Sequence, residues 1–265
     1  MAGVKETPRQ RMIGILYLVL LGLIALSVND SLLDAFKNIT DSLSTSTTNV
    51  NSGVEATFSS FEATKLKDDP IKAKPIYDKA KQASGYARDL ESYINDLKTS
   101  LTEQGGGINE SSGDLEGRAS VDISPRFMIN GGKATDLRKK ITETREKLLG
   151  LLDEKDRKTV KFSLSTIDPP RKGGVSKTWE EANFGDGIPL AAAMTALTKI
   201  QADVKNAESE MVKKILGKMD QAEINLDEFA AVAVAPTSYV IQGQPYTAEV
   251  FLTASSSTLK QTINV

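Results

Sequence analysis

Arg9 and Tyr17 are the residues of this chain whose type and position best suit a chemical role. Arg9 stands just before an unbroken apolar run, Met12 to Val28, and Tyr17 lies inside that run. On a helix, Tyr17 would be about 12 Å beyond Arg9 and within about 80° of it around the axis. An apolar run of this kind is typical of a membrane helix, and tyrosines in membrane helices prefer the membrane interface, where the hydroxyl contacts water. Tyr17 would lie deeper than that interface, which predicts a hydrogen bond to a neighbouring protein chain. The alternative role for Arg9 is contact with lipid headgroups.

The rest of the composition excludes most enzyme chemistry. The 265 residues include no Cys and no His, which rules out Cys/His zinc sites, cysteine nucleophiles, Ser-His-Asp triads and haem bound through His. Gly131-Gly132-Lys133 is similar to part of a phosphate-binding loop, but Phe127 stands where that motif requires glycine. We therefore expect no enzyme, no metal and no cofactor. The net charge of −2 gives no reason to expect nucleic acid as a partner.

The apolar run predicts a single transmembrane helix. Its length of about 17 residues covers about 26 Å as a helix, close to the thickness of a bilayer core. Lys5, Arg9 and Arg11 precede the run, and Asp30 and Asp34 follow it. Because Lys and Arg stay on the cytoplasmic side, residues 1–29 are predicted to form a cytoplasmic tail and a membrane helix. The alternative is a cleaved signal peptide, since small residues near the end of the run fit a cleavage pattern; we expect a retained anchor.

The start of this helix is marked in the sequence. Thr7-Pro8-Arg9-Gln10 has the spacing of a capping box, with proline at the first helical position, so the helix is predicted to begin at Pro8. Small residues inside the run favour close approach of another helix; they are Gly14, Gly22 and Ala25.

Residues 30–225 are predicted to form an elongated α-helical bundle. Four segments carry apolar residues every three or four positions, which is the pattern of amphipathic helices. They are Phe36–Phe61, Ile76–Leu101, Leu137–Leu152 and Leu190–Ile215, and the last includes Gln201 and Glu208 among its stripe positions. The stripes are expected to form the core. Two connections, about 103–132 and about 158–187, are long enough for one of them to cross the length of the bundle.

Residues 226–265 show a different pattern and are predicted to begin a second, β-rich domain of the immunoglobulin-like kind. Segments 229–235, 239–241 and 246–254 are compatible with strands, and the last alternates with period two. Three or four strands are fewer than the roughly seven of such a sandwich. We therefore expect this domain to be truncated in the given sequence.

The residues described so far resemble a known family. The opening MAGVKETPRQRMIGILYLVLLGLIAL, followed by Val28 and Leu32-Leu33-Asp34-Ala35-Phe36, is similar to the GldM/PorM family. Further similarities cover Trp179, Phe184, Ile188-Pro189-Leu190, the stretch 197–204 and spaced residues from Val240 to Leu252. The resemblance extends over the whole chain, and its N-terminal block is the most specific part.

The resemblance implies an inner-membrane component of the type IX secretion and gliding machinery. It implies a homodimer whose transmembrane helices sit inside a GldL-like multi-helix partner ring, with the bulk of the chain in the periplasm. Outer-membrane and periplasmic components of the GldK/GldN kind are expected as further partners. By the same resemblance, Arg9 faces a membrane-embedded glutamate of the ring, and Tyr17 lies in the same interface.

A motor driven by the proton-motive force follows as a hypothesis. Arginine does not deprotonate in proteins, whereas a buried carboxylate can gain a proton and so lose its pairing with Arg9. A sensor of the chemoreceptor type is disfavoured, because only about 11 residues precede the apolar run, too few for an output domain. A passive, membrane-anchored periplasmic scaffold remains open as the alternative function.

Overall fold

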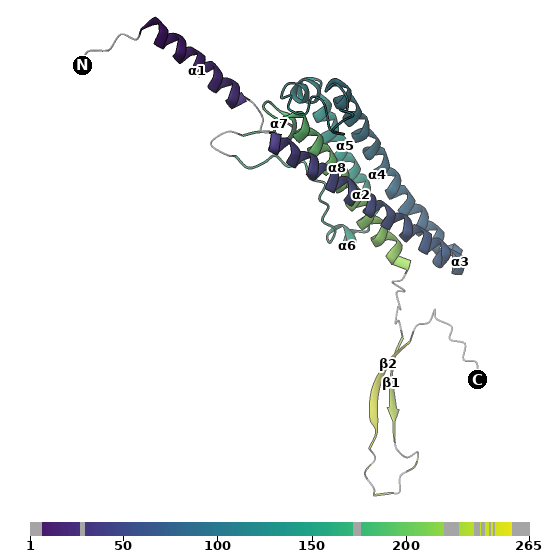
Figure 1. The fold of residues 1–265 in the computed structure, drawn as a ribbon. Helices are drawn as coiled ribbons and strands as arrows, with labels where there is room; N and C mark the ends of the chain where they lie inside the picture. The colour runs from purple at the N-terminus through teal and green to yellow at the C-terminus, as the bar shows by residue number, and fades with distance from the viewer. Residues whose placement is uncertain are drawn as a thin grey trace. The chain divides into compact units, whose positions relative to one another are not determined.

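The chain folds into two compact units, residues 1–219 and residues 220–265, in a computed structural model. The structure describes residues 7–26, 30–171, 176–219, 228–235, 239, 242–243, 245 and 247–255. Figure 1 shows the elements in chain order. The helices of the first unit are α1 (Pro8–Leu26), α2 (Asp30–Ala63), α3 (Lys65–Asp68), α4 (Pro70–Gln104), the π-helical turn η1 (Pro125–Asn130), α5 (Lys133–Gly150), α6 (Glu154–Arg157), α7 (Trp179–Phe184), α8 (Leu190–Leu216) and the 3₁₀ turn η2 (Gly217–Met219).

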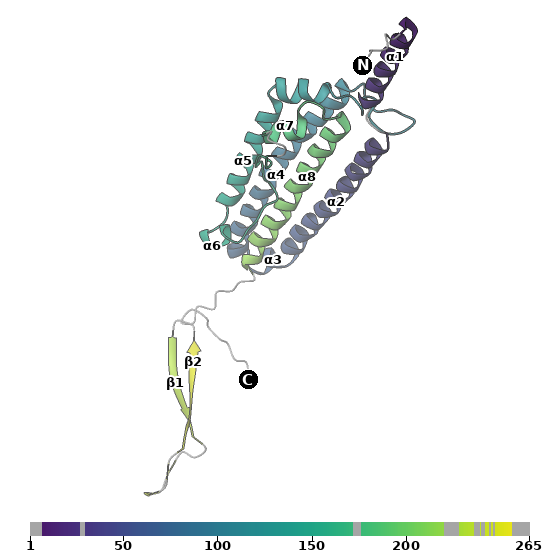
Figure 2. The same ribbon diagram turned by 90° about the vertical axis from the view of Figure 1, so that its left-hand side faces the viewer.

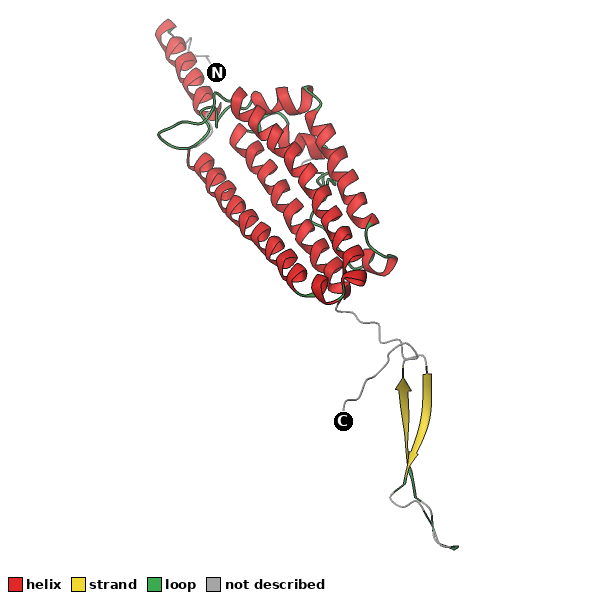
Figure 3. Cartoon of the chain, turned by 90° about the vertical axis from the view of Figure 1, so that its right-hand side faces the viewer, coloured by secondary structure: helices red, strands yellow, loops and turns green. Residues whose placement is uncertain are grey.

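The long helices α2, α4, α5 and α8 form the bundle that the sequence predicts, and they lie side by side in Figures 2 and 3. α8 is the central helix, since it packs against both α2 and α4 and most of its residues are buried. α5 packs against α4 on the side away from α2. α2 is therefore a flanking helix, covered on one side only.

The start of α4 differs from the sequence pattern, which suggested a helix only after Pro75. The helix begins at Pro70, where Asp69 acts as the N-terminal cap and its Oδ1 accepts a hydrogen bond from the Lys72 amide at 3.2 Å. Pro70 occupies a position whose N–H would have no partner in the helix. Pro75 lies inside the helix near its start, where the loss of one backbone donor is tolerated.

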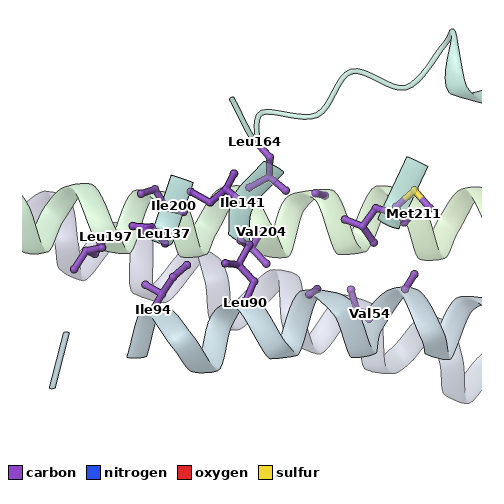
Figure 4. Close-up of a cluster of buried hydrophobic side chains, with 14 of the residues drawn as sticks. Val54, Leu90, Ile94, Leu137, Ile141, Leu164, Leu197, Ile200, Val204 and Met211 are labelled. Atoms are coloured by element: carbon purple, nitrogen blue, oxygen red, sulfur yellow. The ribbon is translucent and has the colours of Figure 1, made fainter. Parts of the chain in front are cut away.

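The core lies between α4, α5 and α8. Figure 4 shows Leu90 and Ile94 of α4 close to Val204 of α8, with Leu137 and Ile141 of α5 beside Ile200. Leu137, Leu197 and Val204 are fully buried, as the apolar repeats predicted. α2 departs from its predicted stripe, because Ile39 is 48% exposed and Phe36, Leu43, Thr47 and Val50 are only half-buried. Its fully buried residues are Leu33, Val54, Phe58 and Phe61.

One of the two long connections crosses the bundle. α5 ends near the C-terminal end of α8, since Asp153 and Asp156 both form ion pairs with Lys218. α7 packs at the opposite end, where the buried Ser124 hydroxyl donates to the Phe184 carbonyl at 3.1 Å. The connection between α6 and α7 therefore runs the length of the bundle, and it buries Val160 and Leu164 on the way. The other connection, between α4 and η1, stays at one end.

The second unit contains an antiparallel pair of strands, β1 (Glu228–Val234) and β2 (Glu249–Ser255), within the residues described. Ala231 pairs with Leu252, and Val232 pairs with Phe251. Of the predicted strand 239–241, only Tyr239 is described, and it is not in a strand. An immunoglobulin-like domain here remains a prediction.

We predict that Leu197→Ala lowers the free energy of unfolding by about 3 kcal/mol, because the residue is fully buried on the central helix and its truncation leaves a cavity. Ile71→Ala is the control. It lies on α4 at 87% exposure and should change the free energy by less than about 0.5 kcal/mol. Urea denaturation followed by circular dichroism measures both. Equal losses for the two variants would contradict the assignment of the core.

Candidate functional site

The N-terminal helix begins with a hydrogen-bonded cap. The Thr7 amide donates to Gln10 Oε1 at 3.0 Å, and the Gln10 amide donates to Thr7 Oγ1 at 3.4 Å. The Arg11 amide reaches the Thr7 carbonyl at 3.1 Å. These reciprocal bonds satisfy backbone donors that the first turn of a helix leaves without partners. The start of α1 is thereby specified by its own residues.

α1 exposes apolar side chains around its whole circumference. Among its described residues, Met12, Leu16 and Leu18 are each more than 70% exposed. A helix that is apolar on every side is stable when something other than water covers it. Within the described part of the chain, no helix has both the length and the apolar character needed to span a membrane.

Arg9 and Tyr17 are both exposed on α1, with Tyr17 at 65%. Neither makes a hydrogen bond or ion pair within the described residues. A Cβ built on Gly14 or Gly22 would meet no atom within 4 Å. The side chain of Ala25 lies outside the described residues. The structure therefore presents Arg9, Gly14, Tyr17 and Gly22 along one helix and, within the described residues, brings none of these four against another part of the chain.

Arg118 ties the start of α2 to the connection that follows α4. Its guanidinium contacts Asp34 at 2.7 Å, Asp114 at 3.0 Å and Asp30 at 3.1 Å. Asp30 and Asp34 occupy the first two turns of α2 and lie four residues apart, on one face of the helix. Hydrogen bonds that the guanidinium donates, first to Asp34 and then to Asp114, raise the pKa of Arg118 above its ordinary value. We call this group the Arg118 joint.

The Arg118 joint also reaches the central helix. The Arg118 carbonyl accepts from the Ala191 amide at 3.0 Å, and the Ser120 carbonyl accepts from the Leu190 amide at 2.8 Å. These are backbone donors of the first turn of α8, which would otherwise lack partners. One short segment therefore connects the first residues of α2 to the first residues of α8.

A stripe of polar side chains runs along α8 and faces α2 and α4. We call it the polar stripe; its members are Thr195, Thr198, Gln201, Lys205 and Glu208. All but Thr195 are buried, with exposures between 2% and 8%. Such groups are stable in a protein interior only when they are hydrogen-bonded. On the α2 side, Thr40 Oγ1 lies 2.9 Å from Thr195 Oγ1.

Lys205 is the centre of the polar stripe. Its Nζ lies 2.9 Å from Glu91 of α4, 3.1 Å from Glu208 of α8 and 3.1 Å from Asn51 Oδ1 of α2. Burial lowers the pKa of Lys205, but hydrogen bonds and charge from Glu91 and Glu208 outweigh that effect, so its pKa is raised. The ammonium is therefore held charged by three helices at once.

Lys98 is a second cation in the same interface, and its surroundings differ. Its Nζ donates to Thr198 Oγ1 at 3.0 Å and to Gln201 Oε1 at 2.9 Å, while Gln201 Nε2 donates to Asn95 Oδ1 at 2.6 Å. No carboxylate forms an ion pair with Lys98 within the described residues. Burial lowers the pKa of Lys98.

Comparison with known families identifies both units. The family model described as GldM N-terminal domain matches residues 31–218, and the model described as GldM second domain matches residues 220–265. The chain belongs to the GldM family. A search of curated proteins finds no match to it.

The GldM match assigns the chain to the machinery of type IX secretion and gliding. GldM is a component of that machinery and is not a known enzyme family. Within the described residues, no group of three or more acidic side chains could hold a metal ion. The GldM N-terminal domain begins one residue after the start of α2, so it contains the polar stripe and most of the Arg118 joint, while α1 precedes it.

The periodic pattern of the sequence did not predict the Arg118 joint or the role of Lys205. Arg118 lies in a polar, glycine-rich connection with no periodic signal. A signal for the polar stripe was present, because Gln201 and Glu208 occupy positions of an apolar repeat. Polar residues at such positions often fix the register of packed helices.

We predict that Arg118→Gln loosens the start of α2, because Asp30 and Asp34 then lose their shared cation. Backbone amides of residues 31–41 should exchange with deuterium severalfold faster, while those of 54–61 keep their protection. Arg126→Gln is the matched control, since Arg126 is exposed at the same end and forms no ion pair within the described residues. Hydrogen exchange with mass spectrometry on the full chain in detergent measures this. Unchanged exchange in 31–41 would contradict the proposed connection.

We predict effects of different size for Lys205 and Lys98, the two lysines that contact the polar stripe. Lys205→Met should lower the free energy of unfolding by about 2 kcal/mol near pH 7, because Glu91 and Glu208 are left without their cation. Lys98→Met should cost less, about 1 kcal/mol, because only the neutral Gln201 Oε1 loses its donor and no carboxylate loses a partner. Urea denaturation provides the comparison.

The pH dependence of the Lys205→Met effect follows from the raised pKa. A raised lysine pKa contributes stability that is fully present below the ordinary value of about 10.4 and is lost as pH rises through the folded value. The difference in unfolding free energy between the unchanged chain and the Lys205→Met variant should therefore be constant from neutral pH to about pH 9 and shrink above about pH 10.4. A constant difference throughout would refute a charge-based role.

Proposed function

We propose that this GldM-family chain is the inner-membrane motor component of type IX secretion and gliding. The observation that carries the proposal is α1, a capped helix with exposed apolar side chains on every side. Such a surface requires a cover, and a bilayer together with partner helices would supply one. Arg9 then stands at the cytoplasmic boundary, with the bulk of the chain in the periplasm.

The proposed chemistry is proton-dependent pairing. Arg9 keeps its charge, so the titrating group must belong to a partner, and a carboxylate in a GldL-like ring meets this requirement. Protonation of that carboxylate breaks its pair with Arg9, and deprotonation lets Arg9 pair with the next copy. Because ionisable groups inside membranes are costly, each pairing strongly favours one helix orientation. Successive protons then turn a homodimer of α1 helices within the ring.

Tyr17 and the small residues of α1 are proposed to complete the intramembrane interface. Tyr17 donates its hydroxyl to a ring helix, and Gly14, Gly22 and Ala25 let helices approach closely. The Arg118 joint supports transmission of the motion, because it fastens the first two turns of α2 to the start of α8. Periplasmic and outer-membrane components of the GldK/GldN kind would receive the motion.

We predict that Arg9→Ala abolishes secretion and gliding while the complex with its membrane partner still assembles. Arg11→Ala is the matched control, since Arg11 is equally exposed on the first turns of α1 and equally basic. It should retain most activity, because the proposed pairing requires Arg9 alone. Secretion, colony spreading and copurification of the membrane complex are measured together for each variant.

The same measurements separate the motor from the passive scaffold. A scaffold needs only assembly, so its function should be lost only when copurification is also lost. Normal secretion and gliding by Arg9→Ala, with an intact complex, would overturn the motor. Equal loss for Arg11→Ala would assign both residues to general headgroup contact.

A further inference from the structure

A cleft of about 720 Å³ lies between α2 and α4, with α8 at its floor. Glu55 and Glu62 line the α2 wall, and Lys81, Ser84 and Arg88 line the α4 wall. The floor includes Lys205 and Glu208 of the polar stripe. One wall is therefore acidic, and the opposite wall is basic.

The cleft is closed at the end near α3. The Tyr77 ring of α4 lies 5.7 Å from Phe58 and 6.3 Å from Phe61 of α2, measured between ring centroids. Lys81 Nζ lies 4.0 Å from the Phe58 centroid and 4.0 Å from Glu62 Oε1. The Tyr77 hydroxyl also donates a hydrogen bond to Glu62 Oε1. α2 and α4 therefore meet here through rings, a hydrogen bond and an ion pair, beside the short turn that joins them.

Further along the cleft, Glu55 of α2 and Arg88 of α4 form a second pair of opposite charges, which lie at the same level along the two helices but do not contact each other. Glu55 precedes Glu62 by seven residues, and Arg88 follows Lys81 by seven, so each is about 10 Å further along its helix. Because the two helices are antiparallel, Glu55 and Arg88 are level across the cleft. Glu55 bonds only to Asn51 of its own helix, at 2.8 Å, and Arg88 has no hydrogen bond or ion pair within the described residues.

The α4 wall also holds a hydroxyl that lacks a partner. Ser84 is 5% exposed, lines the cleft and makes no hydrogen bond. A buried hydroxyl without a partner is costly. It lies one turn before Arg88, and a Cβ built on the neighbouring Gly85 would meet no atom within 4 Å. The α4 wall therefore has space for an approaching side chain beside Gly85, and the Ser84 hydroxyl there lacks a hydrogen-bond acceptor.

α2 is held in a way that permits movement across the cleft. Between Leu33 and Val54 no residue of α2 is fully buried. Its contacts with α8 in this stretch include the Thr40–Thr195 and Asn51–Lys205 hydrogen bonds. Water can bridge the Thr40–Thr195 bond at little cost, unlike the contacts of an interlocked apolar core. The Asn51–Lys205 bond is retained in the proposed movement, because Lys205 lies at the floor of the cleft that α2 closes.

We propose that the middle of α2 bends onto α4 between its two held ends, the Arg118 joint and the ring contacts near α3, pairing Glu55 with Arg88 and bringing an acceptor to Ser84. The charges favour closure over occupation by a small ligand, because the acidic residues of α2 lie level with basic residues of α4, so the two walls attract each other. The bundle would thus have an open state, with the outer pair apart, and a closed state, with both pairs formed. This device belongs to the bundle and stands whether or not protons drive α1.

Cysteine cross-linking tests the closed state, because the chain contains no cysteine of its own. In the full chain in detergent, Ser59→Cys with Gly85→Cys leaves Glu55 and Arg88 in place and should form a disulfide under mild oxidation, since both positions line the cleft at the same height and closure brings them together. The control pair is Ser52→Cys with Gly85→Cys, which is about 10 Å off level and should remain reduced. Absence of the first cross-link, or equal cross-linking of the control, would overturn the proposal.

A second measurement keeps both charges in place. Spin labels at Ser52→Cys and Asp96→Cys, on exposed positions of α2 and α4, report the separation of the helices. With both labels and no other change, part of the molecules should show a label-to-label distance shorter than that of the open state. Arg88→Glu should remove it, and Glu55→Arg with Arg88→Glu should restore it. The same distance distribution in all three would overturn the proposal.

Discussion

The neutralisation of Lys205 is the constraint on which the arrangement of α2, α4 and α8 depends. Removing an ammonium from water costs several kcal/mol unless opposite charge and hydrogen bonds replace the lost hydration. Here Glu91, Glu208 and Asn51 supply them from three helices. A shift of one helix by a single residue would turn at least one of these partners away. The buried cation therefore selects one register among many that apolar packing alone would allow.

Two kinds of contact then divide the bundle. α4, α5 and α8 share an interlocked apolar core, which includes Leu90, Leu137 and Val204 and resists deformation. α2 packs along α8, with Leu33 buried near its start and Val54, Phe58 and Phe61 buried near its end, while the stretch between Leu33 and Val54 has no fully buried residue and includes the Thr40 and Asn51 hydrogen bonds. The three helices α4, α5 and α8 therefore form a rigid part of the bundle, whereas α2 can change its position beside them. α2 is also the helix that directly follows α1 in the chain.

The position of α2 links the fold to the function of the GldM family. The proposed motor must pass force from its membrane helix to the rest of the chain. The Arg118 joint fastens the first residues of α2 to the start of α8, and the long connection that buries Val160 and Leu164 allows α8 to end at the opposite end. Force entering at Asp30 would therefore reach the central helix directly.

Local patterns sufficed to predict much of the fold. The cap formed by Thr7 and Gln10 depends on residues three positions apart, and the apolar repeats of the four long helices depend on residues three or four positions apart. Both can therefore be recognised from the sequence alone. The same repeats misplaced Ile39, which is exposed because α2 is covered on one side only. The start of α4 at Pro70 was also missed, since two prolines close together suggested a later start.

The sequence by itself determined the helices, their apolar stripes, the apolar helix that bears Arg9 and Tyr17, and the resemblance to the GldM family. These properties depend on spacing along the chain, which is visible without a fold. Only the tertiary structure decided that Lys205 pairs with Glu91, that Arg118 joins Asp34, and that Glu55 and Arg88 face each other across a cleft. Charges can pair with any of many partners, and the choice among them is made when packing brings distant helices together.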